Sequence, residues 1–163
     1  MNKYLATMAI GGLFFLEVSI CFAGSIYFHS GSPLARRAES DKAHVFTVES
    51  ALRMQQFNMT TSTNWTDTSE FKGVRISDVL EMFNLTGTRL YFRALDGYSY
   101  EIPISDVGRY SLLLAYERDG INMTIDTLGP FALIYPRSSF PKELNGPETD
   151  AKFIWMIKDV FVE

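Results

Sequence analysis

The chain has 163 residues, of which 47% are hydrophobic and 21% are charged, enough for one domain with a core that needs no disulfide or structural metal. Its net charge of -4 and its 15 scattered lysines and arginines argue against a nucleic-acid partner, which would require clustered positive charge. The one cysteine, Cys21, lies in an N-terminal apolar segment. The folded part therefore has no thiol for a disulfide, a metal or nucleophilic catalysis.

The N-terminal segment has the pattern of an export signal. Lys3 precedes an apolar run over residues 5–28, and the small residues Ala23 and Ser25 follow the most apolar part. This predicts a secretory signal over residues 1–25, cleaved after one of these two positions. The alternatives are an uncleaved membrane anchor over residues 5–28, in which Glu17 would cost about 2.5 to 3.5 kcal/mol, and a buried N-terminal helix. Cleaved or anchored, the domain is expected to be exported, to the periplasm or outside the cell.

Residues 29–42 are rich in Gly, Ser, Pro and charge, which predicts a linker over residues 26–43 and places the domain at residues 44–163. His29 and His44 are each expected to be lone surface histidines. Residues 44–49 alternate as a strand with one wet face, and Ser50 can cap a helical turn over residues 50–54. Residues 57–65 form a Thr-rich extended segment, and residues 76–83 carry apolar side chains at helical spacing.

The second half of the chain has the pattern of strands joined by tight turns. Asp96-Gly97 predicts a hairpin between residues 88–94 and 98–104, followed by a short helix from Ser105. A strand over residues 112–116 leads to a second turn at Asp119-Gly120. The apolar run between Gly129-Pro130 and Pro136 predicts a buried strand. Residues 137–150 are expected to be a loop, and residues 153–162 a closing strand that contains Trp155. This order predicts an α+β domain with a mixed sheet.

The phosphate-binding glycine motifs, the nucleophile elbow and the zinc-protease motif do not occur in the sequence. The carboxylates Asp96, Asp106, Asp119 and Asp126 lie at expected turns or strand ends, where Asp side chains accept local backbone hydrogen bonds. Trp65 follows a polar stretch, and it is expected to pack in the core, with ligand stacking as the alternative. These motifs and single residues therefore do not identify a reaction.

Five segments in a fixed order carry a family resemblance: residues 71–74 with the helix after them, 94–98, 113–116 before Asp119-Gly120, 129–136 and 152–155. Together they resemble the molybdopterin-binding domain of the sulfite oxidase family, over nearly the whole chain from residue 44. The chain looks like the short, exported, single-domain members of that family, in which the segments occur in this order. The resemblance implies a compact α+β fold, with a mixed, mainly antiparallel sheet and short helices, and a pocket for a pterin-dithiolene cofactor, molybdopterin. Neither haem nor zinc is expected.

The resemblance also implies which residues line the cofactor pocket: Thr61, Asn64, Trp65, Asp96, Tyr98, Asp126 and Arg137, with Arg93 or Lys152 facing the cofactor phosphate. For each residue alone, a turn, a core contact or a surface charge is the simpler role. No side chain is assigned as catalytic or as a metal ligand.

The chain departs from the catalytic members in three places. Where they carry a molybdenum-binding cysteine, residues 58–64 hold hydroxyl and amide side chains and no thiol. Where their pattern has a histidine and an arginine, this sequence has Thr127 and Ala132, so a positive charge for an oxyanion or phosphate is lost. These departures argue against the sulfite oxidase reaction.

Two hypotheses follow. The first is an oxidoreductase domain that still binds molybdopterin. The second is a non-catalytic module that keeps the fold and binds a small molecule, or a membrane or periplasmic protein, in the old pocket. The sequence leaves open whether the chain is an enzyme.

Overall fold

The computed structural model describes residues 24–34 and 43–163 as short helices and strands. The strands are β1 (Ser25–Ser30), β2 (His44–Thr47), β3 (Phe57–Thr61), β4 (Ser69–Arg75), β5 (Arg89–Ala94), β6 (Ser99–Pro103), β7 (Leu113–Arg118), β8 (Ile121–Asn122), β9 (Ala132–Ile134) and β10 (Ile157–Val162). The helices are α1 (Val48–Leu52), α2 (Ile76–Met82), α3 (Ile104–Tyr110) and α4 (Pro147–Lys152), with single 3-10 turns η1 (Ile125–Thr127) and η2 (Arg137–Ser139).

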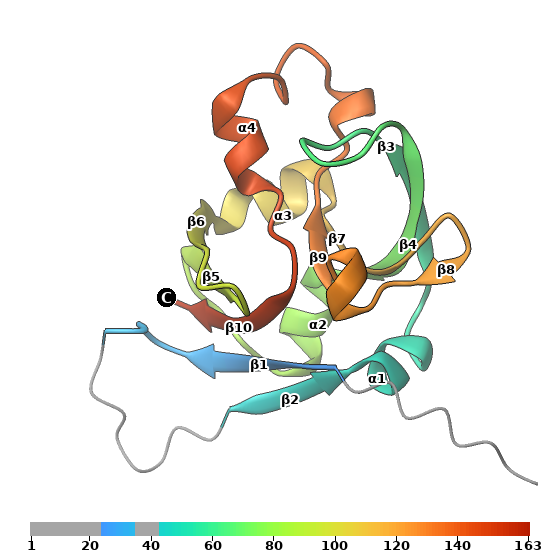
Figure 1. Ribbon diagram of the computed structural model, residues 1–163. Helices are drawn as coiled ribbons and strands as arrows, with labels where there is room; N and C mark the ends of the chain where they lie inside the picture. The colour runs from blue at the N-terminus through green and yellow to red at the C-terminus, as the bar shows by residue number, and fades with distance from the viewer. Residues whose placement is uncertain (1–23, 35–42) are drawn as a thin grey trace, which may run out of the picture.

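The strands form two five-stranded sheets. The first sheet has the order β2-β1-β10-β5-β6, and β1 runs parallel to β10 while the other pairs in the sheet are antiparallel. The second sheet has the order β3-β4-β7-β8, with β9 also paired to β7, and it is antiparallel throughout. Figure 1 shows β1 and β2 at one end of the molecule and α4 at the other. The expected α+β fold with a mixed, mainly antiparallel sheet is confirmed.

The prediction of a linker over residues 26–43 is wrong at its start. Residues Ser25–Ser30 form β1, which lies between β2 and β10 inside the first sheet, with Ile26 and Phe28 fully buried. The alternation of buried and exposed residues is typical of a strand, but the apolar run directly before it obscures this pattern in the sequence. The domain therefore begins before residue 44.

The predicted signal or anchor falls mainly on residues 1–23, which lie outside the described residues, so it stays a prediction. β1 takes the last residues of the apolar run, and a spanning segment that extends to Phe28 is therefore wrong. In the described part of the chain, no helix has the length and apolarity that crossing a membrane requires.

His29 is not the surface histidine that the sequence predicts. It is only 7% exposed, its Nε2 lies 2.9 Å from Asp159 Oδ1, and its ring stacks on Phe161 at 4.4 Å. The cause is β1, which pairs in parallel with β10 and carries His29 to a buried carboxylate there. His44 is exposed, as expected.

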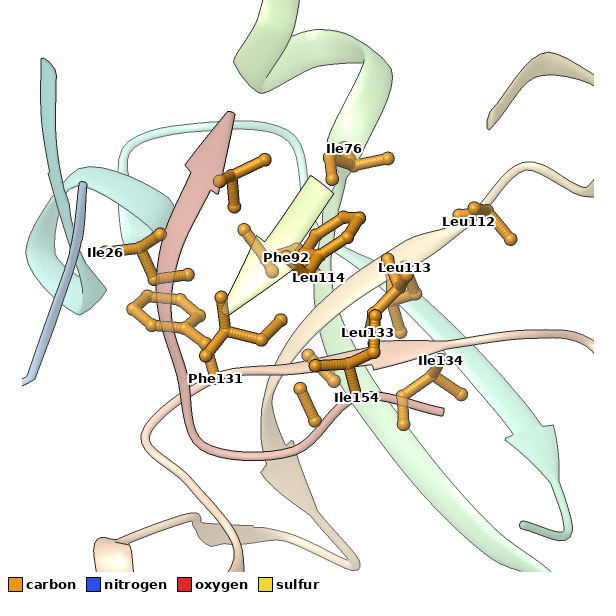
Figure 2. Close-up of a cluster of buried hydrophobic side chains, with 14 of the residues drawn as sticks. Ile26, Ile76, Phe92, Leu112, Leu113, Leu114, Phe131, Leu133, Ile134 and Ile154 are labelled. Carbon is orange, nitrogen blue, oxygen red and sulfur yellow. The ribbon is translucent and has the colours of Figure 1, made fainter. Parts of the chain in front are cut away.

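The core lies between the two sheets. Figure 2 shows Ile26 from β1, Phe92 from β5 and Leu114 from β7 converging with side chains of the 131–134 segment. Residues 131–136 are all buried, which confirms the buried strand expected between Gly129-Pro130 and Pro136. The amide of Leu133 donates to the carbonyl of Ile154 at 2.8 Å, and this isolated bridge ties β9 to the segment before β10.

Local turn and helix signals predicted the middle of the chain correctly. β5 and β6 pair as a hairpin around Asp96-Gly97, and α2 spans Ile76–Met82. The loop expected over residues 137–150 is wrong, because it contains η2 and the start of α4. Pro147 in the first turn of α4, with acidic residues after it and Lys152 in the last turn, is a helix-start pattern that the loop composition obscured.

Smaller boundaries also differ from the predicted ones. The first helix begins after Thr47, whose hydroxyl accepts from the amide of Ser50 at 3.1 Å, so Thr47 and not Ser50 is the cap. The closing strand begins at Ile157, four residues later than predicted. The irregular stretch before it carries side chains that face a pocket rather than a sheet.

Candidate functional site

A pocket of about 340 Å³ lies where four segments meet. The loop after β3, the β5–β6 turn, the residue after η1 and the stretch from the end of α4 to the start of β10 contribute its lining. The lining residues are Asn64, Trp65, Asp96, Tyr98, Leu128, Asp150, Ala151, Phe153, Trp155 and Met156.

The loop after β3 presents Trp65 to the solvent. The hydroxyl of Thr63 accepts from the amides of Trp65 and Thr66, at 3.1 and 3.0 Å, and so turns the chain sharply. Thr63 is buried in the turn, whereas Trp65 is 68% exposed. The expectation that Trp65 packs in the core is therefore wrong, because the threonine takes the inward position.

The β5–β6 turn forms a second wall. Asp96 Oδ1 accepts from the amide of Tyr98 at 2.9 Å, which fixes the turn. The Tyr98 hydroxyl donates to the carbonyl of Ala151 at 2.7 Å and joins this hairpin to the end of α4. Burial, with a smaller contribution from Tyr100, raises the pKa of Tyr98 above its usual range, so the hydroxyl stays protonated and remains a donor.

The third wall depends on Arg137. Its guanidinium pairs with Asp150 through Nη2, donates from Nε to the carbonyl of Leu144 at 3.1 Å, and lies 4.8 Å from the ring centre of Phe153. Arg137 thus holds the start of α4 and the ring of Phe153 in place. Its charge is matched by Asp150, so this predicted cofactor residue acts here as a support behind the pocket.

The structure brings together four of the predicted site residues, namely Asn64, Trp65, Asp96 and Tyr98. The others do not line the pocket. Thr61 is fully buried and accepts from the amide of Ser138 at 3.1 Å, and Asp126 is exposed in η1.

The two cations expected near the cofactor phosphate are engaged elsewhere. Arg93 donates to Asp159 Oδ2 from Nε and Nη2, at 3.0 and 2.8 Å, in the first sheet. Lys152 Nζ lies 3.3 Å from Asp106 Oδ2. Burial disfavours the charged form of Lys152, but the carboxylates of Asp106 and Glu148 together outweigh it, and the pKa of Lys152 is raised.

The sequence did not point to the wall formed by residues 150–156. Phe153 and Trp155 are 2% and 6% exposed, so they have the pattern of core residues in a strand. The helix-start pattern at Pro147 was the signal that could have shown that Phe153 and Trp155 lie outside β10. A helix that ends at Lys152 leaves an irregular stretch before the strand.

The chemistry of the pocket is aromatic and acidic. Its lining side chains, all in the described part of the chain, include two carboxylates, Asp96 and Asp150, and no Lys, Arg, His or Cys. The buried Nε1 of Trp155 has no hydrogen-bond partner among the described residues. Within the same residues, no group of three or more His, Cys, Asp or Glu side chains could hold a metal ion.

Comparison with known proteins identifies the family and the fold. A family model described as the oxidoreductase molybdopterin binding domain matches residues 34–143. Among solved structures, the sulfane dehydrogenase SoxCD from Paracoccus pantotrophus is similar in fold, with a TM-score of 0.62 and 17% sequence identity. The similarity covers 85% of this chain and 38% of that chain. No curated protein matches.

Proposed function

Since the chain belongs to the oxidoreductase molybdopterin binding domain family, we propose that it is an exported member which keeps the family fold and uses the pocket beside Trp65 to bind a small molecule, without molybdenum redox chemistry. The observation that carries this proposal is the lining of the pocket. It lies where the family resemblance predicts a ligand site, yet its charged side chains are carboxylates.

The residues that line this pocket do not fit molybdopterin. A pterin-dithiolene cofactor brings anionic sulfurs and a phosphate, which need positive charge and hydrogen-bond donors around them. Here Asp96 and Asp150 line the pocket, and the nearby Arg137 already pairs with Asp150. Ala132, which stands where the catalytic pattern has an arginine, is fully buried and offers only a methyl group.

The position of the missing cysteine supports the same conclusion. Thr61, within the segment that matches the cysteine region, is fully buried and its hydroxyl is held by Ser138. A neutral hydroxyl in this place is a poor substitute for a soft thiolate. No residue of the described chain is therefore assigned a step in electron transfer.

One wall of the pocket lies beyond the family match. The match ends at residue 143, whereas Asp150, Phe153 and Trp155 come later in the chain. The chain also spans only 38% of the SoxCD chain to which it is similar, so the sulfane dehydrogenase activity in that protein's name is not carried over.

The test is the molybdenum and pterin content of the full-length chain, purified from a host that makes the cofactor. We expect neither metal nor pterin in stoichiometric amount, because the pocket presents negative charge to an anionic cofactor. A cofactor-loaded family member with the cysteine, histidine and arginine in place, made in the same host, is the control. Stoichiometric pterin in the purified chain would overturn the proposal and favour the redox hypothesis.

A further inference from the structure

We propose that the pocket selects an organic cation, of the quaternary ammonium or guanidinium type, and holds it between aromatic rings and the Asp96 carboxylate. This inference rests on the proposed ligand-binding function and names the chemical class of the ligand. It is carried by the combination of rings and charge in one cavity of about 340 Å³.

Four of the lining residues are aromatic: Trp65, Tyr98, Phe153 and Trp155. The face of an aromatic ring carries negative potential and attracts a cation within about 6 Å of its centre, and tryptophan does so most strongly. Trp65 is 68% exposed and Tyr98 is 41% exposed, so both rings are open to a ligand. An exposed tryptophan in a turn that is held by Thr63 gives a ligand a rigid surface without local unfolding.

The pocket wall already accepts one cation. The guanidinium carbon of Arg137 lies 4.8 Å from the ring centre of Phe153, and the same guanidinium pairs with Asp150. This arrangement joins an aromatic face, a carboxylate and a flat cation. Trp65, Tyr98 and Asp96 also combine aromatic rings with a carboxylate in the lining. We infer that the ligand provides the cation there.

The charge of the lining favours a cation over an anion or a neutral ligand. Arg137 balances Asp150, whereas no described Lys or Arg forms an ion pair with Asp96. The pocket is therefore left with one uncompensated negative charge. Asp96 is exposed, so a cation that enters the pocket can approach its carboxylate directly.

The experiment compares choline with its uncharged isostere 3,3-dimethyl-1-butanol, by calorimetry and by the indole N–H signals of Trp65 and Trp155 in NMR spectra. The two probes have the same shape and differ in charge, so the comparison isolates the cation. We expect choline to bind at least roughly tenfold more tightly than the isostere. Inorganic phosphate, as the anionic probe, should leave both indole signals unmoved.

Two variants locate the site. Trp65→Ala should weaken choline binding roughly 3- to 30-fold, because it removes the most exposed ring. Asp96→Asn should weaken it roughly 3- to 10-fold while the turn is kept, since an asparagine side-chain oxygen can still accept from the amide of Tyr98. The matched control is Asp119→Asn, which removes one exposed carboxylate that accepts from the amide of Glu70 at 2.8 Å, outside the lining.

The outcomes are separate from those of the cofactor test. Equal binding of choline and its isostere, no binding of choline, or an Asp96→Asn variant that binds like the control would each overturn the cation proposal. In those cases a chain free of pterin would still be consistent with a ligand-binding module of another specificity. Circular dichroism of each variant shows whether a loss of binding is a loss of fold.

Discussion

The carboxylate of Asp159 illustrates how much depends on one residue. It is 4% exposed, and it accepts hydrogen bonds from Arg93 on β5 and faces His29 on β1. Burial by itself would raise the pKa of Asp159, but the hydrogen bonds from His29 and Arg93 outweigh burial and hold it below the usual range. The ionised form is therefore the one that the fold stabilises.

Replacing this carboxylate should reduce stability markedly. We expect Asp159→Asn to lower the free energy of unfolding by about 2 to 3 kcal/mol, because two buried charge-assisted contacts are lost. Urea denaturation measures the change. Glu101→Gln, which breaks the exposed pair between Arg89 and Glu101 on the same sheet, is the matched control and should cost less than about 1 kcal/mol.

Asp159 also makes the free energy of unfolding depend on pH. Since the folded-state pKa of Asp159 lies below the unfolded value of about 4, its contribution is fully present above that pH and is lost as the pH falls through the folded-state pKa. Wild type should thus lose more unfolding free energy on acidification than Asp159→Asn does. An equal acid sensitivity of the two chains would contradict the assigned contacts.

At the scale of elements, the pairing of β4 with β7 depends on close backbone approach. A Cβ atom at Gly73 would lie 2.1 Å from the carbonyl oxygen of Leu114 and 2.7 Å from Cα of Ala115. The register between the two strands shifts next to this glycine, between Lys72 and Gly73. Only a residue without a side chain lets the two strands meet there.

Substitution by alanine should therefore have opposite effects on the stability of the domain at two glycines. We expect Gly73→Ala to destabilise the domain by about 1 to 3 kcal/mol through overpacking. A Cβ atom at Gly108, in α3, would meet no other atom within 4 Å, so Gly108→Ala should raise stability by about 1 kcal/mol through helix propensity. Thermal unfolding of the two variants measures both changes in stability. A Gly73→Ala variant that is more stable than wild type would contradict the close approach of β4 and β7.

For the whole molecule, β1 decides where the domain begins. This strand lies between β2 and β10, and its residues Ile26 and Phe28 are fully buried in the core. Gly24, just before it, packs so closely on Pro130 that a Cβ atom would lie 2.2 Å from the proline ring. The first sheet is incomplete without this N-terminal stretch.

Truncation tests this arrangement. A chain that starts at Gly24 should fold cooperatively, whereas one that starts at His44 should not, because removal of β1 separates β2 from β10 and exposes apolar surface of both sheets. Urea unfolding followed by circular dichroism distinguishes the two chains. A cooperative unfolding transition in the shorter chain would show that the domain does not need β1 and begins at residue 44.

The sequence by itself determined the elements that depend on local chemistry. The Asp96-Gly97 hairpin, the helical spacing that begins at Ile76 and the buried run after Pro130 each carry their signal within about ten residues, and the ordered set identified the family. Four residues of the candidate site were predicted from the family resemblance, and two of them, Asp96 and Tyr98, lie in the 94–98 segment that carries it.

Only the tertiary structure decided the rest. The contact between His29 and Asp159 joins positions 130 residues apart, and no local pattern indicates it. The inward or outward direction of Trp65 depends on which neighbour the fold buries, and here Thr63 takes the core position. The acidic, aromatic character of the pocket likewise arises from segments that meet only when both sheets and α4 are in place, since charge and ring geometry in a cavity are properties of the assembled chain.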